Sequence, residues 1–332
     1  MSKSKVLTIA LIIVLAGLAI ASWSVFGTTA AGIEYADADK YTAGGTTVTG
    51  AVENLFVDWT CGEVNIVYHA GEGVIISETS QKTISEDDKL RWWLDGTTLR
   101  VRYAKSGFRI SFNLEKQLTV SLPEGAVLKS ADISATSGDL KIPYLAADDI
   151  RLDTTSGNIS AVIAAGKLAA SSTSGDVEIR QAADIETVDL GSTSGSISCE
   201  LGNVRKLAAK STSGSVRAAV TGAADSVKIG STSGNVYPEI ASANKVEISS
   251  TSGCVSGSVA SFAEMKVGTT SGAVTLKLPA EPGFTLKAGT GSGSFNSGIA
   301  MENSRDTYTC GDGSARCEIS TTSGDIRIDP VK

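Results

Sequence analysis

The sequence predicts an all-β protein built as a solenoid, a parallel β-helix with coils of about 19 residues. A Thr-Ser-Gly motif returns at steps of 19, 18, 20, 19, 20, 19, 19, 21 and finally 31 residues. A repeat this short indicates coils that bury their apolar faces only by stacking on their neighbours. The repeated glycines, counting the degenerate Gly-Ser-Gly copy, are Gly138, Gly157, Gly175, Gly195, Gly214, Gly234, Gly253, Gly272, Gly293 and Gly324.

Hydrophobic residues alternate on both sides of each repeated glycine. Ile150 and Leu152 precede Gly157 by seven and five residues, and Ile159 follows it by two. This period of two predicts a β-strand on each side, and the change of parity predicts a corner at the glycine. We expect the corner glycine to adopt a positive φ. We also expect the Thr and Ser hydroxyls of stacked coils, about 4.8 Å apart, to hydrogen-bond along a column. With ten copies and no adjacent base, the serine is structural and not a nucleophile.

The N-terminus predicts a membrane anchor. A short basic tail, residues 1–5, precedes an uncharged run of 21 residues, 6–26, which is long enough to cross a bilayer as a helix. Lysines before the run and acids after it place the tail in the cytoplasm and the body outside. Small residues at Ala21 and Ala30 leave cleavage open as the alternative to an uncleaved signal anchor. A polar spacer, residues 27–47, follows.

The exported body divides into an irregular part, residues 48–130, and a regular solenoid, residues 131–332, with an insertion at about 297–316. The irregular part contains further strand patterns and should form early coils and a cap, which solenoids need to protect their end strands. The insertion is either a capping loop or a binding element. Strands are expected around Val57 and over 64–68, 74–76, 90–94, 99–103 and 118–122.

Charge and cysteine content narrow the function classes further. Beyond residue 26 the chain has 27 basic and 36 acidic residues, a formal charge of −9, which argues against binding to nucleic acid and against docking on anionic lipid.

The cysteines allow at most one disulfide. Cys199 and Cys254 lie three coils apart, about 14 Å, too far for a disulfide. Only Cys310 and Cys317 could pair, across a hairpin at Asp-Gly, so one disulfide or none is expected.

The sequence offers little catalytic chemistry. Its single histidine, His69, has no Ser, Cys or Asp partner that a motif supports, and no cofactor motif is present, so we expect neither an enzyme nor a cofactor. Asp139, Asn158 and Asp176 follow the glycine in three consecutive coils. They would stack on one corner as a weak cation site or, more simply, as turn residues that bond to backbone amides.

Aromatic residues offer a different surface. In a strand, neighbouring side chains face opposite ways, so if Trp92 packs inward then Trp93 points outward. Trp93, with Arg91 and Tyr103, could bind a sugar ring or a partner protein. The alternative is that these aromatics cover the end of the solenoid.

The repeats resemble the bacterial putative adhesin family, catalogued as a domain of unknown function, whose members carry Thr-Ser-Gly-Asp-(Val/Ile) turns. The matching stretches here are 135–140, 172–177 and 321–328, and 120–125 also fits. The resemblance covers about residues 48–332 and implies a right-handed β-helix tethered at the cell envelope.

Three functions follow from the residues and the resemblance together. The first is a non-enzymatic adhesin or envelope scaffold that binds a cell-wall polymer, a glycan or an envelope protein. The second is an envelope-stress sensor or modulator acting with a membrane partner. The third is a polysaccharide-active enzyme, for which the clustered carboxylates that such enzymes use are not apparent in the sequence.

Overall fold

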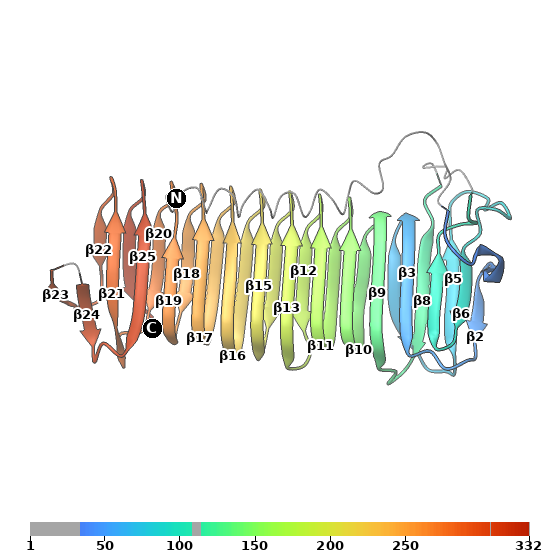
Figure 1. Ribbon diagram of the computed structural model, residues 1–332, viewed down its shortest axis with the longest axis horizontal. Helices are drawn as coiled ribbons and strands as arrows, with labels where there is room; N and C mark the ends of the chain where they lie inside the picture. Colours follow the sequence, from blue (N-terminus) through green and yellow to red (C-terminus); the bar gives the residue numbers. More distant parts are fainter. Residues whose placement is uncertain (1–33, 108–113, 306, 332) are drawn as a thin grey trace.

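The computed structural model describes residues 34–107, 114–305 and 307–331 and shows one long stack of β-coils (Figure 1). Apart from one 3-10 turn, η1 (Ala38–Lys40), the regular elements of the described residues are strands. The predicted tail and membrane-spanning segment, residues 1–26, lie outside the described residues. No helix within the described part of the chain is long and apolar enough to cross a membrane. The parallel solenoid is confirmed, while its right-handed sense stays a prediction.

Parallel strands before and after each corner form the regular coils. Residues at the same offset from the glycine stack in register, as Ile150, Leu168 and Val188 do. All three are buried, so the alternation seen in the sequence is the alternation between core and surface. The strands of this part are β9 (Leu128–Ser137), β10 (Leu140–Thr154), β11 (Ile159–Ser172), β12 (Val177–Gln181), β13 (Ile185–Ser192), β14 (Ile197–Leu201), β15 (Val204–Ser211), β16 (Val216–Ser231), β17 (Val236–Ser250), β18 (Val255–Val259), β19 (Phe262–Gly268) and β20 (Val274–Leu278).

At eight of the ten repeated corners, a buried or half-buried hydroxyl three residues before the glycine bonds both to its own coil and to the adjacent one. Ser211 Oγ donates to the carbonyl oxygen of Gly195 in the neighbouring coil at 2.8 Å and accepts from the amide of Gly214 at 2.9 Å. The predicted column of Thr and Ser hydroxyls one and two residues before the glycine is wrong, because those side chains point to solvent and, apart from Ser292, only their backbones bond between coils. The hydroxyls that make both bonds belong to Thr154, Ser172, Ser192, Ser211, Ser231, Ser250, Thr290 and Thr321.

The corner glycines are required for closeness and not for a positive φ. None of the ten regular corner glycines lies in the left-handed region, which corrects the expectation. A Cβ built on Gly195 would lie 2.0 Å from the carbonyl oxygen of Gly175, and the corresponding distance is 1.8–2.2 Å at the other nine. Any side chain would therefore force adjacent coils apart.

The N-terminal cap, residues 34–123, does not stack in chain order. The coil formed by β3 and β4 lies between the coil of β7 and β8 and the coil of β9 and β10, with Val57 paired to both Val101 and Ile133. Antiparallel strands β6 and β1 continue one face to its end, and β5 and β2 continue the other. The strands are β1 (Thr42–Ala43), β2 (Thr46–Val48), β3 (Asn54–Cys61), β4 (Val64–His69), β5 (Val74–Thr79), β6 (Arg91–Asp95), β7 (Thr98–Arg102) and β8 (Gln117–Pro123).

The C-terminal end repeats this arrangement. The last coil in sequence, β25 and β26, is inserted between β19 and β20 on one side and β21 and β22 on the other, so that Ile319 pairs with both Val267 and Ala288. The outermost coil is therefore an internal segment of the chain. The strands are β21 (Gly283–Thr290), β22 (Phe295–Ser297), β23 (Glu302–Ser304), β24 (Thr307–Gly311), β25 (Ala315–Thr321) and β26 (Ile326–Pro330).

This insertion explains why Cys310 and Cys317 do not form the tentative disulfide. Cys310 on β24 and Cys317 on β25 are free thiols, and β21 lies between their strands. The two cysteines are thus separated by two strand spacings, about 9.6 Å, beyond disulfide reach. For the same reason the Asp-Gly turn does not close a hairpin. Strand β24 instead covers the outer edge of β21. This arrangement agrees with the capping alternative for the 297–316 insertion.

Candidate functional site at the N-terminal end of the solenoid

Lys116 occupies the corner slot of the outermost N-terminal coil. A Cβ on Gly62 would lie 2.3 Å from the carbonyl oxygen of Lys116, just as a Cβ on Gly138 would lie 1.9 Å from that of Gly62. Leu118, two residues after the lysine, pairs with Val64, two residues after the glycine. Lysine is tolerated here because the regular stacking ends at this coil, and its side chain turns into the core.

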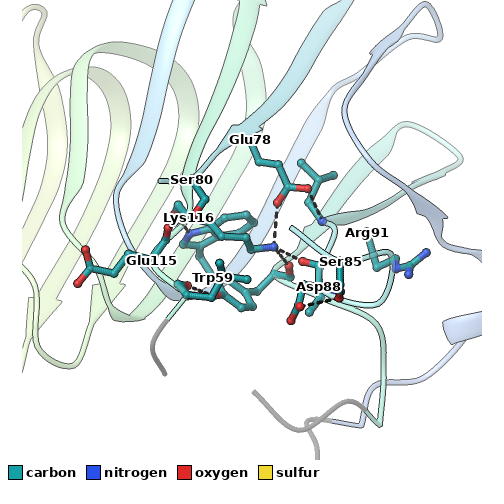
Figure 2. Close-up of polar contacts among 12 residues, drawn as sticks. Trp59, Glu78, Ser80, Ser85, Asp88, Arg91, Glu115 and Lys116 are labelled. Carbon is teal, nitrogen blue, oxygen red and sulfur yellow. Dashed lines mark hydrogen bonds and ion pairs between the residues drawn. The ribbon is translucent and has the colours of Figure 1, made fainter. Parts of the chain in front are cut away.

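The Lys116 ammonium is fully surrounded by acceptors. It forms an ion pair with Glu78 at 2.8 Å and donates hydrogen bonds to the carbonyl oxygens of Asp88 and Tyr103 (Figure 2). The Lys116 side chain is 0% exposed and that of Glu78 6%. The second carboxylate oxygen of Glu78 accepts the amide of Leu90 at 2.8 Å. The Lys116 side chain thereby connects β5, which carries Glu78, with the loop at Asp88 and with Tyr103 just after β7.

Two aromatic rings complete the surroundings of the ammonium. Lys116 Nζ lies 4.9 Å from the ring centre of Trp59 and 4.1 Å from that of Tyr103, and Trp59 Nε1 donates back to the Lys116 carbonyl at 2.9 Å. Burial lowers the pKa of Lys116, although Glu78 opposes this shift. Burial raises the pKa of the Tyr103 phenol. Because the ammonium's hydrogen-bond donors are taken up by these partners, the arrangement is a structural lock that holds the cap together.

A strap formed by residues 34–43 covers the outer face of β6 beside this lock. The ring of Tyr41 lies 5.7 Å from that of Trp93, and Lys40 Nζ lies 4.8 Å from the Trp93 ring centre. Tyr35 donates its hydroxyl to the carbonyl oxygen of Ala104 at 3.0 Å. The strap is thus held mainly by two tyrosines and a lysine.

Cations and aromatic rings alternate beneath the strap. The guanidinium of Arg102 lies 5.1 Å from the Tyr35 ring and 4.9 Å from the Phe56 ring, and that of Arg100 lies 5.6 Å from Phe56 and 5.9 Å from Trp93. Arg91 pairs with Arg102 across β6 and β7. The Nε atoms of both these arginines are buried without an acceptor among the described residues. The surface is therefore rich in hydrogen-bond donors.

The residues predicted to form a binding surface differ in whether they face outward or lie in the core. Trp93 faces outward and Trp92 faces the core, as the alternation implied. Trp93 is not an open platform for a sugar ring, since Lys40 and Tyr41 cover it. Tyr103 is 4% exposed and belongs to the core, so its assignment to a binding surface is wrong.

The remaining predicted polar residues have structural roles. His69 Nε2 is hydrogen-bonded with the Gly73 carbonyl oxygen at 3.0 Å. Asp139 Oδ1 accepts the amide of Asn158, and Asn158 Oδ1 accepts the amide of Asp176, each from the next coil. These bonds are those of the turn-residue alternative. Among the described residues no group of three His, Cys, Asp or Glu side chains is placed to hold a metal ion.

Exposed hydroxyls form the most extended polar feature of the surface. Thr and Ser lie exposed at successive positions before the glycine of nine stacked coils, in two parallel columns. Their spacing is that of stacked strands, about 4.8 Å. These pairs are 136–137, 155–156, 173–174, 193–194, 212–213, 232–233, 251–252, 270–271 and 322–323.

Lys116 was not predicted as a site residue, although the sequence contains a signal for it. Leu118, Val120 and Leu122 repeat the alternation that follows a corner glycine, which puts Lys116 at the glycine offset. The partner Glu78 had no such signal, because its pairing depends on how distant strands stack.

Comparison with known proteins points to one family. The model of the Toastrack DUF4097 family matches residues 52–265 and 260–329. No curated protein matches the chain.

Similar solved structures include a "putative lipid binding protein" from Parabacteroides distasonis, with 14% identity, coverage of 88% of this chain and 97% of the other, and a TM-score of 0.41. A "putative adhesin" from Bacteroides fragilis has 15% identity, 90% and 100% coverage, and a TM-score of 0.33. A "putative cell adhesion protein" from Clostridium sporogenes has 12% identity, 88% and 100% coverage, and a TM-score of 0.22.

Proposed function

For this chain, which belongs to the Toastrack DUF4097 family, we propose a non-enzymatic, adhesin-like scaffold at the cell envelope. Its segment 6–26 anchors it in the cell membrane, with the N-terminus in the cytoplasm and the solenoid outside. The ligand is an extended polymer or glycan, or an envelope protein, that binds along a face of the β-helix.

The observation that carries the proposal is the double column of exposed Thr and Ser at the corners. Each hydroxyl can both donate and accept a hydrogen bond. The columns repeat the same pair of groups over nine coils, which fits a ligand that is itself extended and repetitive. A single small molecule would use only one or two of these coils. The buried hydroxyl three residues before the glycine holds the corner, so the exposed columns are free for contact.

The experiment is retention of the full chain on isolated cell-wall polymers and a glycan panel, with the size of the polymer measured before and after. We expect retention and an intact polymer. The variant replaces Thr173, Thr193, Thr212, Thr232 and Thr251 by valine, which keeps the β-branched shape and removes the hydroxyls.

A matched control replaces five exposed residues on a strand face, and it should retain the polymer as the unmodified chain does. Loss of retention in the threonine variant alone supports the corner columns as the binding surface. Shortened polymer would overturn the non-enzymatic assignment. Failure of the unmodified chain to retain any polymer would remove the polymer as ligand and leave the protein partner, which crosslinking in cells would then identify.

A further inference from the structure

The strap is a small element with few anchors. Its only ladder with β6 is the two-residue strand β1, in which Thr42 pairs with Trp92 and Ala43 with Arg91. Outside this ladder the strap is held by the Tyr35 and Tyr41 rings, by Lys40 over Trp93 and by a few hydrogen bonds. Segments with so few buried contacts open at low free-energy cost compared with the core.

The strap and the face beneath it are complementary in charge. The strap contributes Glu34, Asp37 and Asp39, all exposed. The face is lined by the cations of Arg91, Arg100 and Arg102. Arg100 and Arg102 also form ion pairs with Asp95 and Asp58 of the cap, and the Nε–H groups of Arg91 and Arg102 are buried beneath the strap without an acceptor among the described residues. The surface thus fits an acidic segment that carries tyrosines.

The strap leads directly into a glycine pair. Gly44, in the left-handed region at φ +82°, and Gly45 connect it to β2 at the extreme end of the rod. On the other side, residues 27–33 connect the strap to the segment proposed to cross the membrane. If copies are anchored in this way, their N-terminal caps lie at a similar height above the bilayer, where the straps of neighbouring copies can meet.

We propose that neighbouring copies exchange straps, so that residues 34–43 of one copy dock on β6 and β7 of another. The exchanged contact repeats every interaction of the internal one, and confinement in the membrane raises the local concentration of the partner. Because only Gly44 and Gly45 join the strap to the cap, the two caps must lie face to face in a symmetric pair. This inference rests on the proposed membrane anchor.

The test uses two versions of the full chain that carry different tags and are expressed in one cell, one with Tyr41→Cys and the other with Trp93→Cys. The two residues face each other in the antiparallel register that Thr42 and Trp92 define, at a ring separation of 5.7 Å. Both versions also carry Cys254→Ser, which removes the exposed thiol. Neither version can form this disulfide within one chain, so a crosslinked species with both tags requires exchange.

We expect oxidation of the membranes to give this species at about tenfold the level of a control. In the control, Glu239→Cys, at an exposed site on the middle of the rod, replaces Trp93→Cys. A single chain with both Tyr41→Cys and Trp93→Cys shows whether the two thiols meet and the cap is folded. Closure of that internal disulfide without any two-tag species above the control overturns the exchange. Fractionation of the same cells tests the anchor separately, because a chain in the soluble fraction contradicts the proposed localisation whatever the crosslinking shows.

Discussion

The regular coils and the N-terminal cap are built on the same parallel stacking, but they close their corners with different chemistry. In the regular coils a glycine lets the backbones touch, and a Ser or Thr hydroxyl bridges two coils. In the cap the glycine slot of the last coil holds Lys116, whose charge is neutralised by Glu78 inside the core. A repeated corner can rely on its neighbours for every bond, whereas a terminal corner has a neighbour on one side only.

The cap chemistry reflects the way in which a solenoid must end. An exposed coil edge invites pairing with another chain, so both ends need protection. At each end the chain inserts a coil from near its terminus beneath an outer coil and covers the edge with antiparallel strands. The ends are therefore held by contacts between segments that are distant in the sequence.

The largest effect should come from removing the buried charge of the cap. Lys116→Met leaves Glu78 buried without its partner and should lower the free energy of unfolding by about 3–5 kcal/mol. Urea unfolding followed by tryptophan fluorescence measures it, because Trp59 lies against the lysine. The double variant Lys116→Met with Glu78→Leu should regain most of the loss. A single variant that loses under about 1 kcal/mol would show that the pair does not hold the cap.

A methyl group at a central corner should be the next most costly change. Gly195→Ala places a carbon 2.0 Å from the Gly175 carbonyl oxygen, and the strain should amount to about 3 kcal/mol or more. Since each coil contacts only its neighbours, we also expect the denaturation curve to separate into two transitions. Gly202→Ala is the control, because nothing lies within 4 Å of its Cβ. Equal midpoints for the two variants would refute the role of close stacking.

Loss of one bridging hydroxyl should lower the free energy of unfolding by a smaller amount. Ser211→Ala leaves the Gly195 carbonyl and the Gly214 amide without this partner, at a cost of about 1–3 kcal/mol. Ser211→Thr should be nearly neutral, since Thr154 makes the same two bonds in another coil. The exposed Ser213→Ala, two positions on, should stay within about 0.5 kcal/mol. Shifts in denaturation midpoint at constant slope measure all three, and a Ser213 effect as large as that of Ser211 would reverse the assignment.

The smallest effect should come from a surface ion pair. Arg217 and Glu239 lie 3.0 Å apart with side chains 54% and 55% exposed, so Glu239→Gln should change the free energy of unfolding by at most about 0.5 kcal/mol. The change should vanish at high salt, whereas that of Lys116→Met should persist because its site excludes solvent ions. Thermal melts at low and high salt compare the two. A salt-sensitive Lys116 variant would mean that its site is open to solvent.

Much of the candidate site could not be predicted from the sequence, for identifiable physical reasons. The outward direction of Trp93 followed from simple alternation, but its cover by Lys40 and Tyr41 depends on a strap that lies 52–53 residues earlier in the chain. Tyr103, just after β7, continues the alternation of the buried residues Leu99 and Val101, so its burial could have been predicted from the sequence. Cys310 and Cys317 are close in sequence, yet β21 separates them in space.

The sequence by itself determined the coil. Its period, the placement of hydrophobic residues at fixed offsets and the glycine at each corner are local properties, so each repeat specifies its own strands and turn. Only the tertiary structure decided the order in which the end coils stack. Gly138 stacks on Gly62 and Gly324 stacks on Gly272, although the two glycines of each pair are separated in the sequence by much more than one repeat. That order is set by which distant strands complete each other's hydrogen bonds, and the same distant pairing brings Glu78 to Lys116 in the closed N-terminal cap.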